Sequence, residues 1–142
     1  MELPSDAKKV EILTRTECFG LLGGQSVGRV GASIGALPVI LPVNFAVLGE
    51  SVIFRTTPGS KLDAATVGAV VAFQADRYEP FGPAGWSVLI QGKASEVSDP
   101  RQQQLAEGLP LAWWDDRTDA GRLVRLEGTH VSGRRFRPFR WR

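Results

Sequence analysis

Several residue types are scarce in this chain of 142 residues, and each scarcity excludes a class of site. Cys18 is the only cysteine, so an internal disulfide is impossible, and this usage fits a reducing compartment such as the cytoplasm. His130 is the only histidine, which leaves no cysteine–histidine set with the spacing of a zinc site. We therefore expect a chain without disulfides and without a bound metal.

The chain also lacks a long uninterrupted apolar run and a strong excess of one charge. The longest apolar segment, residues 37–48, contains two prolines and an asparagine, so no segment predicts a membrane span. Residues 1–10 are polar and predict a loose arm without the apolar core of a signal peptide. The 17 basic and 15 acidic residues give a net charge of +2, which does not by itself indicate nucleic-acid binding. Neither a membrane nor a nucleic acid is therefore an expected partner.

Short β-forming segments separated by turn signals make up most of the chain, and they predict one mainly β domain over residues 1–142. The apolar fraction of 43% is sufficient for one core. Strands are predicted at residues 27–33, 37–48, 52–56, 69–78, 86–97 and 122–131. Helices are predicted after a capping box at residues 14–17, from residue 60, and over residues 100–107. Six strands joined by short turns favour an antiparallel barrel whose interior is filled by side chains. A large cofactor would then lie on the outer surface or at a subunit interface.

The segment at residues 54–62, Phe-Arg-Thr-Thr-Pro-Gly-Ser-Lys-Leu, carries the clearest chemical signal. A strand runs into a Pro-Gly turn, and a helix begins at Ser60, a favourable N-cap. Arg55, Thr56 and Lys61 flank the free N–H groups of that helix, which is typical of a phosphate site. The alternative is an ordinary corner with solvated cations. Neither the P-loop pattern nor the dinucleotide glycine pattern fits, because the required glycine spacing is missing.

The order of several short motifs resembles that of the pyridoxamine 5′-phosphate oxidase-like FMN-binding split-barrel family. The motifs are Gly-Arg-Val at 28–30, Leu-Pro-Val-Asn-Phe at 41–45, the segment at 54–62, Val-Ala-Phe-Gln-Ala-Asp at 71–76, the run from 85 to 94, and Gly-Arg-Arg-Phe at 133–136. No single motif is specific, whereas the ordered set is specific for the superfamily. The resemblance implies a homodimeric six-stranded antiparallel split barrel with a flavin in the groove between two subunits.

The resemblance also implies roles for individual residues. The residues implied to hold the FMN phosphate are Arg55, Thr56, Ser60 and Lys61. Main-chain groups around Pro42, Val43 and Asn44 would border the isoalloxazine ring. Trp86 and Ser87 would approach the cofactor from the neighbouring subunit.

The activity implied by the resemblance is that of a flavin-dependent oxidoreductase acting on a small-molecule substrate or electron acceptor. No catalytic acid–base set is recognisable, which suits a protein whose cofactor supplies the chemistry. The alternatives are a deazaflavin-dependent reductase and a non-enzymatic flavin- or haem-binding protein, with His130 as the haem-ligand candidate. The basic and aromatic tail, residues 137–142, differs from the substrate motif of pyridoxamine phosphate oxidase itself, and its role stays open.

Overall fold

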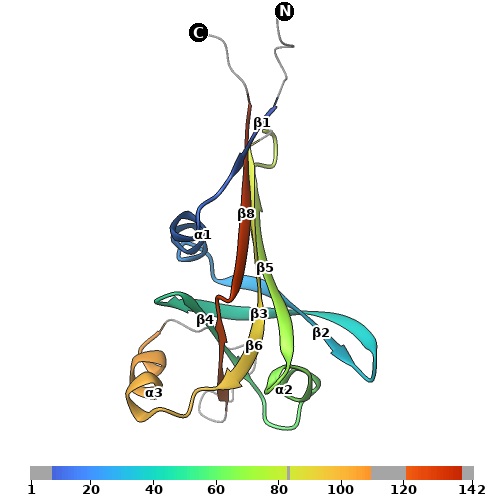
Figure 1. Cartoon of the computed structure of the whole chain (residues 1–142), viewed down its shortest axis with the longest axis vertical. Helices are drawn as coiled ribbons and strands as arrows, with labels where there is room; N and C mark the ends of the chain where they lie inside the picture. The colour runs from blue at the N-terminus through green and yellow to red at the C-terminus, as the bar shows by residue number, and fades with distance from the viewer. Residues whose placement is uncertain (1–7, 83, 110–120, 139–142) are drawn as a thin grey trace, which may run out of the picture.

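The computed structural model describes residues 8–82, 84–109 and 121–138 (Figure 1). The strands are β1 (Lys8–Ile12), β2 (Val27–Ile34), β3 (Leu37–Leu48), β4 (Ser51–Thr56), β5 (Val70–Tyr78), β6 (Gly85–Glu96), β7 (Arg122–Glu127) and β8 (His130–Pro138). The helices are α1 (Arg15–Leu22), α2 (Lys61–Thr66) and α3 (Pro100–Glu107). The predicted mainly β composition and the three predicted helices are confirmed.

Six strands close into a barrel in which every neighbouring pair is antiparallel. The order around the ring is β6–β5–β2–β3–β4–β7, and a short ladder between β7 and β6 completes it. That ladder pairs only Ala94, Ser95 and Glu96 of β6 with β7, whereas β5 pairs with β6 over nine positions, from Val70↔Lys93 to Tyr78↔Gly85. The six-stranded split barrel predicted from the sequence is thus confirmed.

Two further strands extend the sheet beyond the barrel. Strand β8 pairs with β6 from Gln91↔His130 to Gly85↔Phe136, and β1 pairs with β8 from Ile12↔Arg134 to Lys8↔Pro138. Figure 1 shows β5, β6 and β8 running along the long axis, while β2 and β3 lie across it. We call the end of this extension, where β1 and β8 meet the β5–β6 turn, the tip.

The last predicted strand, residues 122–131, proved to be two strands with a bend between them. Strands β7 and β8 both follow one edge of β6, and the chain crosses over Gly92 between them. A Cβ atom at Gly92 would lie 2.9 Å from the carbonyl oxygen of Glu127 and 3.0 Å from Oγ1 of Thr129. Only a glycine allows this close crossing, and periodicity alone does not reveal it.

The predicted loose arm is wrong for residues 8–10, which lie in strand β1. Their partner on β8 is more than 120 positions away in the sequence, so local composition does not indicate the pairing. Residues 137 and 138 of the predicted tail likewise belong to β8. Residues 1–7 and 139–142 lie outside the described residues.

The barrel interior is filled by apolar side chains, as a barrel of this size requires. Phe45, Phe54 and Phe73 are at most 2% exposed, and the rings of Phe45 and Phe73 meet edge to face at 4.7 Å. Helix α1 packs against β8 and begins with the predicted capping box, in which Thr14 and Glu17 exchange hydrogen bonds. Among the described residues, no helix is long and apolar enough to cross a bilayer.

Gly28 on β2 gives a test of this packing. A Cβ atom there would lie 2.5 Å from Cε2 of the fully buried Phe73, so Gly28→Ala forces the ring to move. We expect the free energy of unfolding to fall by about 1–3 kcal/mol, measured by urea denaturation. The control is Gly20→Ala in α1, where the added carbon would meet no atom within 4 Å apart from the backbone of its own helix and its chain neighbours, and where alanine favours the helix. Equal stabilities of the two variants would contradict the packing described here.

Candidate functional site

The corner between β4 and α2, residues 55–63, is held together by hydrogen bonds to the carboxylate of Asp63. Thr56 at the end of β4 is buried, and its hydroxyl donates to Oδ1 of Asp63 over 2.7 Å. The Gly59 N–H donates to Oδ2 of Asp63 over 3.0 Å. Ser60 is the N-cap of α2, as predicted, and its hydroxyl accepts from the Asp63 N–H over 3.1 Å. Asp63 therefore fixes the turn through both its side chain and its main chain.

A distant arginine completes this cluster. Arg122 opens β7 directly opposite Thr56, and its Nε donates to Oδ1 of Asp63 over 2.8 Å. Its NH1 group also donates to Glu96 over 3.0 Å. Sequence reasoning missed Arg122, because 59 positions separate it from Asp63 and only the β4–β7 register brings them together.

The surroundings keep Asp63 ionised. Burial by itself would raise the pKa of this carboxyl, but hydrogen bonds from Thr56, Gly59 and Arg122, with the charge of Arg122, outweigh burial and lower the pKa. The hydrogen bonds and charges of Glu96 and Asp63 raise the pKa of Arg122. The corner therefore holds a permanent internal ion pair.

The two other cations of the corner stay outside this pair. Arg55 is half-buried and faces away from Thr56 on the alternate side of β4, while Lys61 is exposed at the first position of α2. Neither side chain forms an ion pair with any residue that the structure describes. Thr56 has already given its only hydroxyl hydrogen to Asp63, whereas the Ser60 hydroxyl still has a hydrogen to donate. A phosphate would accordingly find Arg55, Lys61 and Ser60 available, and the predicted roles of all four residues stay predictions.

The β3 residues expected beside a flavin ring alternate between two sides of the sheet. Val43 points into the barrel and is 3% exposed. Pro42 is exposed and lies opposite Arg29 on the outer face. Asn44 is half-buried on that same outer face, opposite Val27. Pro42 and Asn44 can therefore border a ligand with their side chains, and Val43 only with its main chain.

The outer face continues across β2 and β5 with small and polar residues. Gly31 and Ala72 lie opposite each other, and beside them Gln74 donates to Asp76 over 2.7 Å. Arg29 approaches Asp76 at 3.9 Å. Ser87 on β6 is half-buried and lies opposite Asp76, so it also belongs to this face. The small side chains at Gly31, Ala72 and Ser87 leave room for a planar group or another protein surface to approach this face closely.

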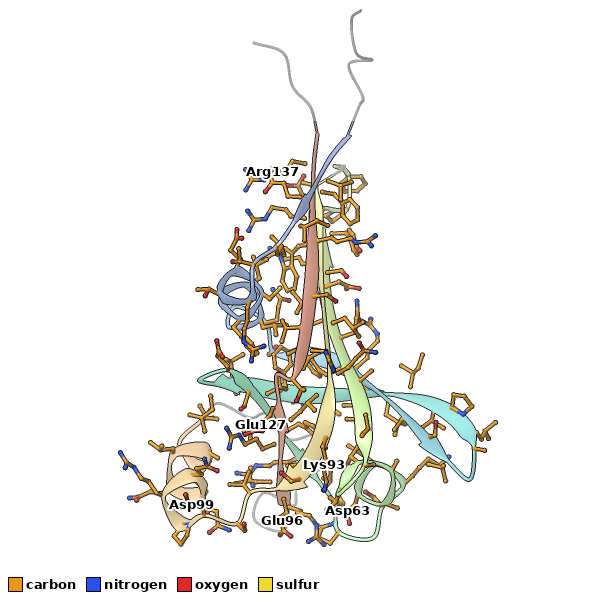
Figure 2. The ribbon with its side chains drawn as sticks, in the orientation of Figure 1. Asp63, Lys93, Glu96, Asp99, Glu127 and Arg137 are labelled. Carbon is orange, nitrogen blue, oxygen red and sulfur yellow. The ribbon has the colours of Figure 1, made fainter. Side chains whose placement is uncertain are left out.

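Trp86 lies on the other side of β6 and is 9% exposed. It is near the tip, between Arg77 on β5 and Arg135 on β8. Figure 2 shows Asp63 of the corner and Arg137 of the tip at opposite ends of the long axis. One chain therefore does not bring its own corner and its own Trp86 together, so the predicted cofactor residues fall into separate groups.

In the part of the chain that the structure describes, no metal centre accompanies these groups. The described residues contain no group of three or more histidine, cysteine or acidic side chains able to hold a metal ion. His130 is exposed at the start of β8. Cys18 is buried in α1, and burial raises the pKa of its thiol, which disfavours the reactive thiolate.

The ion pair at the corner predicts a specific dependence of stability on pH. Because folding lowers the pKa of Asp63, its stabilisation is complete above the ordinary carboxyl range, about pH 4, and is lost as the pH falls through the lower folded value. We expect Asp63→Asn to lower the free energy of unfolding by about 1–3 kcal/mol at pH 7 and by progressively less as the pH falls below about 4, measured by urea denaturation. Glu107→Gln, at an exposed helix end, should have little effect at either pH. A cost of Asp63→Asn that is independent of pH would refute the ionic role.

Comparisons with known proteins agree with this architecture. A model of the pyridoxamine 5′-phosphate oxidase family matches residues 14–135. The protein Rv0080 of Mycobacterium tuberculosis is 38% identical over 138 residues, which cover 94% of this chain and 90% of that protein. The solved FAD binding protein from Mycobacterium smegmatis is 35% identical with a TM-score of 0.78, covering 89% of this chain and 97% of its own. A FAD-binding protein from Mesorhizobium loti, 23% identical with a TM-score of 0.74, shares the fold over 92% of this chain and 99% of its own. The resemblance seen in the sequence is thereby confirmed, and the chain belongs to the pyridoxamine 5′-phosphate oxidase-like family.

Proposed function

We propose that this chain is a flavin-binding oxidoreductase that works as a homodimer in the cytoplasm, with the phosphate of FMN held at the β4–α2 corner. The observation that carries the proposal is the pair Arg55 and Lys61 beside a turn that Asp63 already fixes. A preorganised turn loses little conformational entropy on binding, so more of the charge attraction appears as affinity. Family membership and the 35% identity to a FAD binding protein support a flavin as the ligand.

FAD is the second candidate for the cofactor, because the M. smegmatis relative is a FAD binding protein. FMN and FAD share the phosphate that follows the ribityl chain, so the same corner serves either. A deazaflavin is the remaining alternative, and a visible spectrum separates it from a flavin. The bound cofactor would supply hydride or electron transfer, while the protein supplies binding, orientation and electrostatics. This division of labour suits a site without an acid–base set.

A homodimer is proposed because one chain leaves its site residues separated and its outer face uncovered. Three large apolar side chains of the outer face are strongly exposed, namely Val27 (47%), Ile40 (73%) and Val70 (77%), and Leu37 (67%) is exposed at the end of the β2–β3 hairpin. Beside them are two shallow grooves of about 290 and 360 Å³, both lined by Gly31, Ile40 and Ala72. A second copy related by a two-fold axis would cover this patch and could supply the partner's Trp86 and Ser87 to each corner.

The phosphate assignment predicts the effect of removing both cations. In the variant Arg55→Ala with Lys61→Ala, each lost charged hydrogen bond removes about 1.5–3 kcal/mol, so FMN and FAD affinity should fall roughly 100-fold or more. Fluorescence titration of both flavins measures the change. Arg101→Ala removes an exposed cation from α3 and should leave affinity unchanged. Unaltered flavin binding by the double variant would remove the corner from the site.

The dimer proposal predicts a particle of about twice the 15.4 kDa chain mass in light scattering. Ile40→Asp places a charge in the centre of the exposed patch and should shift the protein toward the monomer and weaken flavin binding. Leu105→Asp, on the exposed side of α3, is the matched control and should leave the dimer intact. A flavin-loaded monomer at micromolar concentration would contradict the interface site.

A further inference from the structure

A cavity at the tip is separate from the β4–α2 corner. It has a volume of about 280 Å³ and lies between the ends of β5, β6 and β8. Its polar lining comes from Arg77, Glu79, Arg135 and Arg137, its aromatic ring is that of Trp86, and Ala84, Gly85 and Phe136 complete the wall. We call it the tip cavity. Three guanidinium groups around an indole provide both charge and a flat apolar surface.

The strand register explains why these side chains converge. Arg77, Trp86 and Arg135 are directly opposite one another on β5, β6 and β8, so they project from the same side of the sheet. This side is the continuation of the barrel interior, where Val88 and Ile90 of β6 are fully buried. At the tip this row of apolar side chains ends, and Arg77 and Arg135 occupy the neighbouring positions on β5 and β8. On the reverse side, the rings of Tyr78 and Phe136 lie 6.3 Å apart and support the same strands.

Three carboxylates lie near the arginines, but they accept no hydrogen bonds from the guanidinium groups. Glu11 approaches Arg135 at 3.9 Å and Arg137 at 3.6 Å, distances too long for hydrogen bonds. Glu17 also feels the charges of these two arginines, but its carboxylate accepts from the Thr14 N–H over 3.0 Å in the capping box of α1. Glu79 lies on the cavity wall. Within the described residues, none of the three guanidinium groups of the cavity donates a side-chain hydrogen bond.

The missing hydrogen bonds matter most at Arg135, because its side chain is only 22% exposed and water reaches it poorly. A guanidinium group presents a planar fork of N–H donors that matches the two oxygens of a carboxylate. Trp86 beside it offers its ring to an aromatic group. The cluster is close to electroneutral, so its selectivity would come from this geometry and not from a general positive field.

We propose that the tip cavity binds a small planar aromatic molecule that carries a carboxylate, with the carboxylate at Arg135 and Arg77 and the ring against Trp86. This class of molecule would be the substrate or electron acceptor, and that part of the proposal rests on the proposed oxidoreductase function. The existence of the site rests only on the cavity and its arginines.

Calorimetric titration of the full chain with benzoate and with benzamide tests the charge requirement. The two probes have nearly the same shape and differ in charge, so benzoate should bind about tenfold or more tightly than benzamide. Amide shift changes in NMR spectra should centre on residues 84–87 and 134–137. Equal affinities, no benzoate binding at millimolar concentration, or shift changes elsewhere would overturn the proposal. Inorganic phosphate binding as tightly as benzoate would overturn the aromatic requirement.

Arginine variants then test the location. Arg135→Gln should weaken benzoate binding about tenfold or more, and Arg77→Gln, which alters an exposed side chain and leaves the fold in place, should weaken it in the same direction. Arg101→Gln on α3 should change nothing. The variant Arg55→Ala with Lys61→Ala should lose flavin and keep benzoate, which separates failure of the corner from failure of the tip cavity. Retained benzoate affinity in both Arg135→Gln and Arg77→Gln would place the ligand elsewhere.

Discussion

Closure of the barrel depends on one edge of β6, which β7 and β8 share. Only the three β6 residues at 94–96 pair with β7, and beyond Gly92 the same edge belongs to β8. The first residue of β7, Arg122, is at the same time tied to Asp63 at the β4–α2 corner. A shift of β7 by one residue would turn Arg122 to the opposite side of the sheet and leave the Asp63 carboxylate without its cation. Barrel register and corner geometry are therefore set by the same strand.

The length of the extension beyond the barrel explains why the functional groups are far apart in one chain. Strand β6 has twelve residues, of which the last three close the barrel and the first seven pair with β8. Trp86 therefore lies near the tip, while the corner lies beside the last residues of β6, where Glu96 binds Arg122. Bending β6 within one chain to bring Trp86 closer to the corner would break the ladder between β5 and β6. In the proposed homodimer, a second copy would complete the site from the other end, and the exposed side chain of Ile40 belongs to the surface proposed to bind that copy.

Local chemistry in the sequence predicted most elements, and long-range pairing accounts for the failures. The Thr14–Glu17 capping box and the Ser60 N-cap are signals within four residues, and both were confirmed. Strand β1 was missed because its partner is at the far end of the chain, and the bend between β7 and β8 was missed because it depends on space above Gly92. At the corner, the sequence indicates Asp63 only through its place in the first turn of α2, where a carboxylate suits the positive end of the helix. Its bond to Arg122 requires the β4–β7 register, which no local pattern encodes.

The internal ion pair also restricts how the corner can hold a second anion. Asp63 already accepts hydrogen bonds from the hydroxyl of Thr56 and the N–H of Gly59. An anion on that side would therefore find these donors occupied and would be repelled by the charge of the carboxylate. The positive charge of Arg122 is shared between Asp63 and Glu96, and α2 has only six residues to contribute a dipole. Little attraction therefore remains except that of Arg55 and Lys61. Because these two side chains lie outside the pair, a phosphate must approach from their side, where affinity depends on direct contact and not on the field of the corner as a whole.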